Sequence, residues 1–394
     1  MKPGFNELSD SVIERGLCTA CGTCIGVCPR KVIGVEYENG EPTPALKGDC
    51  LPCGICVKVC PGASIPIPEL ERFCFGRERE EKPEDLGVYL SSRVGWAGAN
   101  EIRQAGSDGG IVSALLIHAL ESGLIDCCLL AGFDDEHPWK AQPKIATTRE
   151  EIIACAQSKP VVVMNNALLQ TAIKRGYKKI GIAGVPCHVH AARMIQYYDL
   201  PKQISSKIKL VIGLFCGSNN VFESTRHILY EMCGVEDLAD VQKLEYRGGD
   251  WPGGFVVQSK TKGRQMIDKH LYSLHFQVAT YQRDRCNMCL DWSSDLADVS
   301  VGSYWGEGEG RCTMLVRTSL GEKLVQGAEE AGVVKTEPLS PAHVVASYGY
   351  EVKRHGHAFR LMRRQRFGWP TPDYHRRFSF APIRKELWLC PETE

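Results

Sequence analysis

The chain has 394 residues, more than one hydrophobic core usually fills, so two or three modules are expected. Its 47 lysines and arginines balance its 47 aspartates and glutamates, which removes any global charge that would favour nucleic acid or an anionic membrane surface. The sequence contains neither a run of roughly 20 apolar residues that could span a membrane nor an N-terminal signal peptide. We therefore expect a cytoplasmic protein, free or peripheral on a membrane complex, whose 19 cysteines serve metal ligation or redox chemistry rather than disulfides.

The first predicted element is a repeated spacing of cysteines. CTACGTCIGVCPR begins at residue 18 and CLPCGICVKVCPG begins at residue 50, and both copies read C-x2-C-x2-C-x3-C-P. This is the spacing of bacterial two-cluster ferredoxins, in which three close cysteines hold one cubane and the fourth reaches the other. We therefore assign two [4Fe-4S] clusters, the first to Cys18, Cys21, Cys24 and Cys60 and the second to Cys50, Cys53, Cys56 and Cys28.

Structural zinc is the alternative for these eight thiols. Zinc sites normally use two separated pairs of ligands, and a tight triplet followed by Cys-Pro fits that pattern poorly. Gly22 and Gly54 lie between ligands, where the backbone must curl around the cluster, and Pro29 and Pro61 end each turn. Such clusters carry one electron at a time and perform no substrate chemistry, so the rest of the chain should hold the site that supplies the electrons.

Beyond the repeat, residues 76–88 are charged, contain a proline and lack an apolar period, which is typical of a linker. Apolar strands and amphipathic helices then alternate, an order that indicates an α/β domain. Helices are predicted over residues 109–123, 148–156, 165–176, 188–198, 220–234 and 321–332. Strands are predicted at 125–133, 178–187 and 207–217, and hairpins between 241 and 319.

The fold class that follows is an α+β ferredoxin-like module with two clusters, followed by a larger α/β domain with a mixed sheet. The predicted boundaries are residues 1–75 for the first module, 76–88 for the linker, 89–340 for the larger domain and 341–394 for a C-terminal extension. The extension is basic and aromatic. Its simplest interpretation is a solvated segment packed on the domain or on a partner subunit.

A glycine turn opens the first helix of the larger domain. Ser107, Asp108, Gly109 and Gly110 stand directly before that helix. Backbone N–H groups at a helix start attract phosphate or pyrophosphate, and glycine permits close approach. A Ser-Asp N-cap followed by glycines also opens helices that bind no ligand, so this motif alone leaves both interpretations open.

Four more cysteines form a second candidate metal site. Cys187 and Cys216 follow predicted strands, where open α/β sheets bind ligands, and Cys286 and Cys289 form a C-x2-C pair. In isolation the first two would be structural and the pair a zinc motif. Beside two clusters, a third [4Fe-4S] site is the preferred interpretation. The remaining cysteines are taken as structural or unassigned: Cys74, Cys127, Cys128, Cys155, Cys233, Cys312 and Cys390.

These motifs together resemble the coenzyme F420 hydrogenase/dehydrogenase beta-subunit family, flavin-containing iron-sulfur proteins that include a plant chlorophyll-cycle reductase. The matching stretches are GSDGGIVSALL, SKP, GVPCH, FCG, YRGGDWPGG and CNMCLDWSSDLADVSVGSYWG, all within residues 90–320. The cysteine repeat adds residues 1–65, an arrangement seen in members that carry their own clusters. His188 departs from the family, in which Gln commonly follows the cysteine.

The resemblance implies FAD in the larger domain, a [4Fe-4S] cluster beside it and coenzyme F420 as the substrate. A reduced deazaflavin gives up a hydride, whereas a cubane accepts one electron. A flavin can take the hydride and release electrons singly, so the path would run from F420 through FAD and the inner cluster to the two ferredoxin clusters. No general acid or base is needed for this transfer.

The resemblance also selects candidate contacts. Residues 107–110 and Ser158 are candidates for FAD. Fixed cations are needed for the acidic tail and phosphate of F420, although a surface charge is the favoured interpretation for any one of them. These cations are Lys159, Arg247, Arg283 and Arg285.

Three functions remain open from the sequence. The first is an F420-dependent subunit that passes electrons to or from a hydrogenase, a formate dehydrogenase, a heterodisulfide reductase or a respiratory complex. The second keeps the cofactors but is a ferredoxin-driven reductase of another ring, as in the plant relative. The third is an adaptor whose cysteine repeat connects two subunits while the α/β domain binds no flavin.

Overall fold

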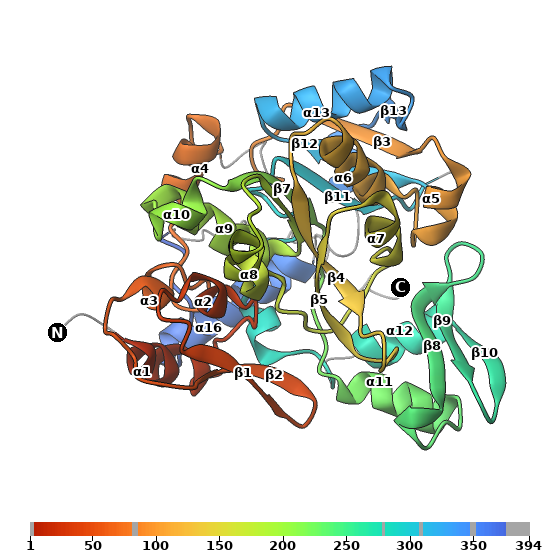
Figure 1. Cartoon of the computed structure of the whole chain (residues 1–394), viewed down its shortest axis with the longest axis horizontal. Coiled ribbons are helices and arrows are strands. Elements are labelled where there is room, and N and C mark those ends of the chain that lie inside the picture. Colours follow the sequence, from red (N-terminus) through yellow and green to blue (C-terminus); the bar gives the residue numbers. More distant parts are fainter. Residues whose placement is uncertain (1–3, 81–85, 278–279, 307–309, 347–351, 376–394) are drawn as a thin grey trace, which may run out of the picture.

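The structure of the protein is a computed structural model, which describes residues 4–80, 86–277, 280–306, 310–346 and 352–375. A central sheet lies between helices, with the cysteine-repeat module (residues 4–75) at one end of the molecule and a smaller three-stranded sheet at the other (Figure 1). Residues 81–85 of the predicted linker, Cys390 and the end of the predicted extension lie outside the described residues.

The cysteine-repeat module consists of short helices beside a two-stranded antiparallel ribbon. Its elements are α1 (Phe5–Leu8), the π-turn η1 (Ser9–Ile13), α2 (Thr23–Val27), β1 (Ile33–Glu38), β2 (Glu41–Leu46), α3 (Ile55–Lys58) and α4 (Ile67–Phe75). The backbone at Gly22 and Gly54 is left-handed, with φ of 79° and 77°, immediately before α2 and α3. Glycine is needed there because the chain reverses between the second and third cysteine of each run.

The larger domain is built on an eight-stranded mixed sheet, which confirms the predicted α/β class. Its strands are β3 (Ser91–Ala97), β4 (Cys127–Phe133), β5 (Ala141–Ala146), β6 (Ile180–Gly184), β7 (Ile208–Leu214), β11 (Val299–Ser303), β12 (Cys312–Val316) and β13 (Val334–Pro338). The order across the sheet is β13-β3-β12-β11-β7-β6-β4-β5. The four strands β11, β7, β6 and β4 run parallel, and the strands on both sides of them pair antiparallel.

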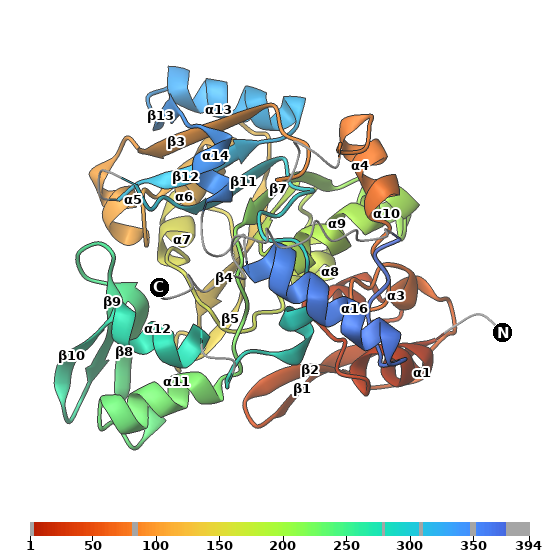
Figure 2. The ribbon, with the colours of Figure 1, turned by 180° about the vertical axis from the view of Figure 1, so that it is seen from behind.

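Helices cover both faces of this sheet (Figures 1 and 2). One face carries α5 (Asn100–Ala105), α6 (Ile111–Glu121), α7 (Arg149–Ala154) and α13 (Ser319–Glu330). The other carries η2 (Asn165–Leu168), α8 (Leu169–Lys174), α9 (Pro186–Tyr198) and α10 (Lys202–Ser205). Strand β4 is apolar on both sides, because Cys127 and Leu129 face the second layer while Cys128 and Leu130 face the first.

The cysteine-repeat module shares a core with the sheet. Val27 and Val59 belong to the same apolar cluster as Ile195 of α9. A Cβ on Gly26 would lie 2.0 Å from the backbone oxygen of Asn166, so only glycine lets α2 approach so closely. The two parts therefore form one packed unit rather than two separate modules.

Residues 76–88 differ from the predicted linker. Arg79 is buried, and its guanidinium pairs with Glu71 of α4 and with Asp295, 2.7 Å from Nη1 to Oδ2. Leu86 and Val88 are also buried. The prediction was wrong because charged residues usually remain in water, whereas here two carboxylates from other elements compensate the arginine in the interior.

The hairpins predicted between residues 241 and 319 divide between two sheets. Strands β11 and β12 pair with each other within the central sheet. The residues before them form a separate three-stranded antiparallel sheet with a core cluster of its own. It consists of β8 (Val241–Gly248), β9 (Gly254–Ser259) and β10 (Gly263–Asp268). Around it lie α11 (Glu223–His227), the π-turn η3 (Ile228–Met232), η4 (Leu238–Asp240) and α12 (Lys269–Gln277). A short 3-10 helix, η5 (Asp284–Met288), then carries the chain back toward the central sheet.

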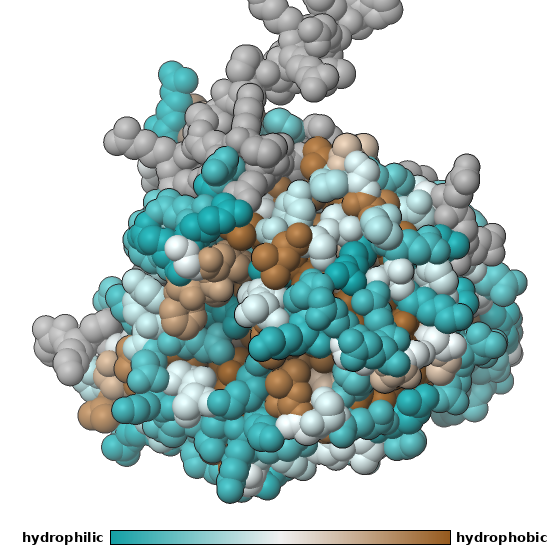
Figure 3. All heavy atoms as spheres, turned by 90° about the horizontal axis from the view of Figure 1, so that it is seen from above, coloured by the Kyte–Doolittle hydropathy of each residue, from teal (hydrophilic) through white to brown (hydrophobic). Residues whose placement is uncertain are grey.

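The C-terminal part contains α14 (Pro341–Val345), the π-turn η6 (Val352–His357) and α16 (Ala358–Arg366). Helix α16 lies beside the cysteine-repeat module (Figure 2), and the backbone N–H of Ile65 donates to the oxygen of Asp373 at 2.7 Å. Viewed from above, hydrophilic side chains cover most of the visible face and apolar ones are scattered between them (Figure 3). Within the described ranges, no helix combines the length and apolar character that crossing a bilayer requires.

Candidate functional site

The eight cysteines of the repeat surround two cavities. The first cavity is lined by Cys18, Cys21, Cys24 and Cys60. The second is lined by Cys28, Cys50, Cys53 and Cys56. The structure thus brings the fourth cysteine of each run to the triplet of the other run. In the part of the chain that the structure describes, no three His, Cys, Asp or Glu side chains converge on a point that one ion could occupy.

The surroundings of these thiols fit iron-sulfur clusters. Burial raises the pKa of Cys56 to about 11 and that of Cys60 to about 12, because a thiolate without a compensating cation is costly in the interior. A metal cluster supplies that compensation. Backbone N–H groups also point at sulfur, from Ala20 to Cys18 Sγ at 3.3 Å and from Phe5 to Cys50 Sγ at 3.4 Å.

The four inner cysteines also come together. Cys187 lies in the first turn of α9, Cys216 follows β7, and Cys286 and Cys289 lie in and after η5. Burial raises the pKa of Cys187, and the other three sulfurs and Cys21 are close enough to raise it further. The backbone N–H of Asn219 donates to Cys286 Sγ at 3.4 Å. The inner set therefore lies next to the first cavity of the repeat.

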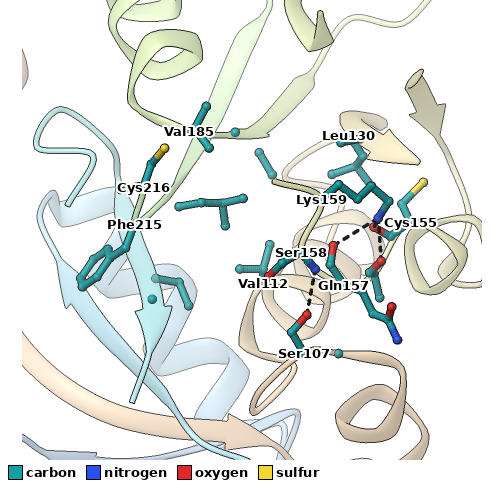
Figure 4. Close-up of a pocket in the computed structure, with 18 of the residues that line it drawn as sticks. Ser107, Val112, Leu130, Cys155, Gln157, Ser158, Lys159, Val185, Phe215 and Cys216 are labelled. Carbon is teal, nitrogen blue, oxygen red and sulfur yellow. Dashed lines mark hydrogen bonds between the residues drawn. The ribbon is translucent and has the colours of Figure 1, made fainter. Parts of the chain in front are cut away.

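A cavity of about 320 Å³ opens at the carboxyl ends of the parallel strands (Figure 4). Open α/β sheets bind ligands at this edge. Phe215 and Cys216 stand on one side of the cavity, and Ser107, Ser158 and Lys159 stand on the other (Figure 4). One inner cysteine is therefore part of the cavity wall.

The glycine turn lines this cavity, but its side chains have partners within the protein. Ser107 Oγ accepts a hydrogen bond from the N–H of Ser158 at 2.8 Å. The backbone N–H of Ala97 donates to the oxygen of Gly109 at 2.6 Å. The turn is thus held in place from the end of β3 as well as from the segment after α7.

Asp108 faces Arg247 rather than an open part of the cavity. Its carboxylate accepts from Arg247 Nη1 at 3.0 Å and Nη2 at 2.9 Å, from Ser303 Oγ at 2.9 Å and from Trp251 Nε1 at 3.3 Å. A carboxylate repels a pyrophosphate, so Asp108 serves to hold Arg247 beside the turn.

Lys159 lies at the end of α7. Its Nζ donates to the backbone oxygens of Cys155 at 3.0 Å, Ala156 at 2.8 Å and Gln157 at 3.2 Å. A lysine commonly caps the last carbonyls of a helix in this way. Burial lowers the pKa of Lys159 to about 8.

Arg283 and Arg285 are not among the residues that line the strand-end cavity, and their role as contacts to F420 stays a prediction. Arg283 Nη1 donates to the backbone oxygen of Thr19 at 3.3 Å, and Arg285 Nη2 donates to that of Pro61 at 3.0 Å. Their position next to the C-x2-C pair puts them between the inner cysteines and the repeat. They hold the two metal-site segments together.

Two buried acceptors in the cavity test whether a flavin fits. Asn165 Nδ2 donates to the oxygen of Ala183 at 3.0 Å, and His188 Nε2 donates to that of Val163 at 2.9 Å. Asn165 Oδ1 and His188 Nδ1 are buried and have no partner among the described residues. Burial lowers the pKa of His188 to about 4, so its ring is neutral and Nδ1 accepts. Unsatisfied buried acceptors are costly, so the cavity fits a ligand with hydrogen-bond donors, as a flavin ring and its ribityl chain have.

Comparison with known proteins identifies the family. The family is described as coenzyme F420 hydrogenase/dehydrogenase, beta subunit; residues 93–170 match its N-terminal part and residues 177–342 match its C terminus. The coenzyme F420 hydrogenase subunit beta of Methanosarcina barkeri is 31% identical over 264 residues, which cover 64% of this chain and 84% of that protein. The chain belongs to the coenzyme F420 hydrogenase/dehydrogenase beta-subunit family. It is therefore an oxidoreductase subunit.

Further similarities cover the cysteine repeat and most of the chain. Residues 17–65 match the 4Fe-4S dicluster domain. One subunit of the F(420)H(2) dehydrogenase of Methanosarcina mazei is 29% identical over 363 residues, covering 88% of this chain and 92% of the relative. A chain of the F420-reducing [NiFe] hydrogenase complex of Methanosarcina barkeri superposes with a TM-score of 0.61 at 28% identity, covering 74% of this chain and 97% of that one.

One charged residue beside the inner cysteines was not predicted from the sequence. Lys353 is buried in the C-terminal segment, near enough to the Cys289 sulfur for that sulfur to stabilise its charge. Nothing distinguishes it in the sequence from the exposed basic residues that follow it. Asn165 was also missed, whereas His188 had a signal, since it replaces the Gln that commonly follows the cysteine in the family.

Proposed function

We propose that the protein exchanges a hydride between coenzyme F420 and FAD, and relays single electrons through three [4Fe-4S] clusters to or from a partner oxidoreductase. The observation that carries this proposal is the continuity of the sites. Cys216 belongs both to the wall of the strand-end cavity and to the inner cysteine set, and the inner set lies beside Cys21 of the first repeat cavity.

FAD and the clusters, when bound, supply the conversion of a hydride into single electrons. The chain's own contribution is to bind and orient them. Ser107, Gly109, Gly110 and Ser158 offer backbone and hydroxyl groups to the FAD phosphates and ribityl chain, since they line the cavity or the turn that borders it. Asn165 and His188, both on the cavity wall, offer acceptors to ring or ribityl donors.

The positions of the metal sites set the order in which electrons pass through them, in either direction. Cys187 of the inner set is close to Cys21. The nearer of the two repeat cavities to the inner set is therefore the one lined by Cys18, Cys21, Cys24 and Cys60. The cavity with Cys28, Cys50, Cys53 and Cys56 lies farther along. Leu51 beside it is 54% exposed, which makes this side of the module the exit toward a partner. The close approach at Gly26 and the hydrogen bonds of Arg283 and Arg285 bring the metal sites together.

Positive charge at the cavity favours an anionic substrate. Lys159 lines the cavity, and its amino group is held by three carbonyls rather than by a carboxylate. Arg247 stands beside the turn, fixed by Asp108. Trp251 and Trp305 lie near it with ring centres 5.4 Å apart and ring planes tilted by 49°, and the amino group of Lys269 lies 3.6 Å from the ring centre of Trp305. These groups are the proposed contacts for the phosphate and acidic tail of F420.

The experiment that tests this function uses the full chain, isolated anaerobically and reconstituted with iron, sulfide and FAD. We expect about twelve iron atoms per chain, four for each of three clusters, and one FAD. Reduced F420 should bleach the flavin and then reduce the clusters, whereas NADH should not. Bleaching by NADH at a comparable rate, or zinc in place of iron, would refute the proposal. Turnover of a cyclic tetrapyrrole with ferredoxin and no response to F420 would favour the ring-reductase alternative.

A further inference from the structure

The chain after residue 342 lies beyond the residues that the beta-subunit family matches, yet it reaches the inner cysteines. His357 Nδ1 donates to the backbone oxygen of Cys289 at 3.1 Å. The hydroxyl of Tyr374 donates to the oxygen of Met288 at 2.8 Å. Helix α16 and the turn η6 thus cover the C-x2-C loop from outside, in contact with both the loop and the cysteine-repeat module (Figure 2).

This segment brings a cation into the inner site. Lys353 of η6 is 1% exposed, and the Cys289 sulfur is near enough to stabilise its positive charge. Cys216 and Cys286 are the other sulfurs near enough to stabilise its charge. A buried ammonium is costly unless negative charge compensates it. Neutral thiols cannot do so, whereas four thiolates around a [4Fe-4S] core form a net anion that gains one more negative charge on reduction.

Arg285 is the other cation at this place, but its position differs. Its guanidinium lies near Cys286 and Cys289 and also donates to Pro61 of the repeat, so it stands between two metal sites. The pKa of Cys18 in the first cavity also responds to Arg285. The charge of Arg285 therefore acts on both the inner metal site and the first repeat cavity. The sulfurs near Lys353, in contrast, all belong to the inner set.

We propose that Lys353 is a positioning residue that raises the reduction potential of the inner cluster, and that the C-terminal segment thereby sets the step at which electrons leave the flavin. This inference rests on the proposed function, because it needs the third cluster. The physical reason is that a fixed cation in a poorly solvated site stabilises the more negative, reduced cluster more than the oxidised one. Hydrogen bonds to cluster sulfurs act in the same direction.

The test uses the reconstituted full chain and two variants, Lys353→Met, which removes the charge at similar volume, and Lys353→Arg, which keeps it. The matched control is Arg363→Gln, which removes a positive charge from the exposed face of α16. Iron, sulfide and FAD are counted first, and each cluster is then titrated by EPR-monitored potentiometry. For Lys353→Met we expect at least a tenfold lower equilibrium constant for reducing the inner cluster, about 59 mV for a one-electron couple. The two repeat clusters should not shift, and Lys353→Arg and Arg363→Gln should resemble the parent protein.

The outcomes separate this inference from the proposed function. An inner cluster that is retained in Lys353→Met with an unchanged potential would overturn the inference while leaving the proposed function intact. Loss of the inner cluster from both Lys353 variants would also overturn it, because the side chain would then be structural. Loss from Lys353→Met alone would support the role of the charge. Only about eight iron atoms in the parent protein would remove the third cluster, and with it both proposals.

Discussion

The two cavities of the cysteine repeat and the cavity at the strand ends differ in what lines them and in how far apart their residues lie in the chain. Each repeat cavity is walled by four sulfurs from within residues 18–60 and is closed by short helices. The strand-end cavity is walled by backbone, hydroxyl and apolar groups from residues 106–312. The first type suits a compact inorganic ligand, and the second suits a larger molecule with several polar edges. The inner cysteines join the two types of cavity, since Cys216 lines the strand-end cavity and Cys187 lies close to Cys21 of the first repeat cavity.

The largest expected effect comes from removing Cys216, the inner cysteine that lines the strand-end cavity. Cys216→Ser should lose the inner cluster and lower the rate of electron arrival at the repeat clusters by more than about 100-fold, beyond the 10–100-fold typical of groups behind a metal ligand. Flavin bleaching by reduced F420 should persist. Iron analysis and rapid-freeze EPR after mixing with reduced F420 measure both. Cys74→Ser is the matched control, because Cys74 lines none of these cavities. An unchanged iron content in Cys216→Ser would contradict the assignment.

The next largest effect distinguishes the roles of the two repeat cavities, because each variant removes one ligand from one of them. Cys60→Ser should remove the nearer cluster, so reduced F420 would no longer reduce the farther one within the assay time. Cys28→Ser should remove the farther cluster and leave reduction of the nearer one intact. The cause is the exchange of the fourth cysteine between the two runs. EPR spectra of the two variants provide the measurement, and an identical pattern of loss in both would show that the exchange is wrong.

A smaller effect is expected at the strand-end cavity. Arg247→Ala leaves the part-buried Asp108 with Ser303 and Trp251 as its remaining hydrogen-bond partners, and the cost of about 3–5 kcal/mol for breaking a fully buried ion pair is an upper bound here. The glycine turn should loosen, and the dissociation constant of FAD should rise roughly tenfold or more, since a cost of about 1.4 kcal/mol is already tenfold. Equilibrium dialysis of FAD measures this. Arg283→Ala should leave FAD binding unchanged, because Arg283 contacts Thr19 outside the cavity. Equal weakening in both variants would argue against the specific role of Arg247.

The smallest effect concerns pH. Burial lowers the pKa of Lys159 from its usual 10.5 to about 8. Lys159 is therefore charged below pH 8 and loses its proton as the pH rises through that value, while an unfolded chain keeps it up to about 10.5. Affinity for the anionic F420 should fall a few-fold between about pH 7 and pH 9. Lys159→Arg keeps its charge over this range and should show a flat profile, as measured by titration of F420 against flavin fluorescence. A decline of equal size in Lys159→Arg would assign the effect to another group.

Much of the fold could be predicted because its signals are local. Helix α6 lies within the predicted 109–123, and β4 lies within 125–133. Helix α7 begins within the predicted 148–156, and Thr148 caps it, since its Oγ1 accepts from the N–H of Glu151 at 3.3 Å. The linker prediction failed at Arg79, because its carboxylate partners Glu71 and Asp295 lie 8 and 216 residues away. A local pattern carries no information on such pairing.

The sequence by itself determined the parts of this protein whose geometry depends on short spacing. Cysteines three and four residues apart can only wrap a compact group, so the two clusters and the exchange of the fourth ligand were readable from residues 18–61. The tertiary structure decided which charges meet which site. Arg283 and Arg285 bond to backbone oxygens of Thr19 and Pro61 in the cysteine repeat, and Lys353 is buried near Cys289. The energy of a buried charge depends on partners brought near by the whole fold, and distance along the chain does not report them.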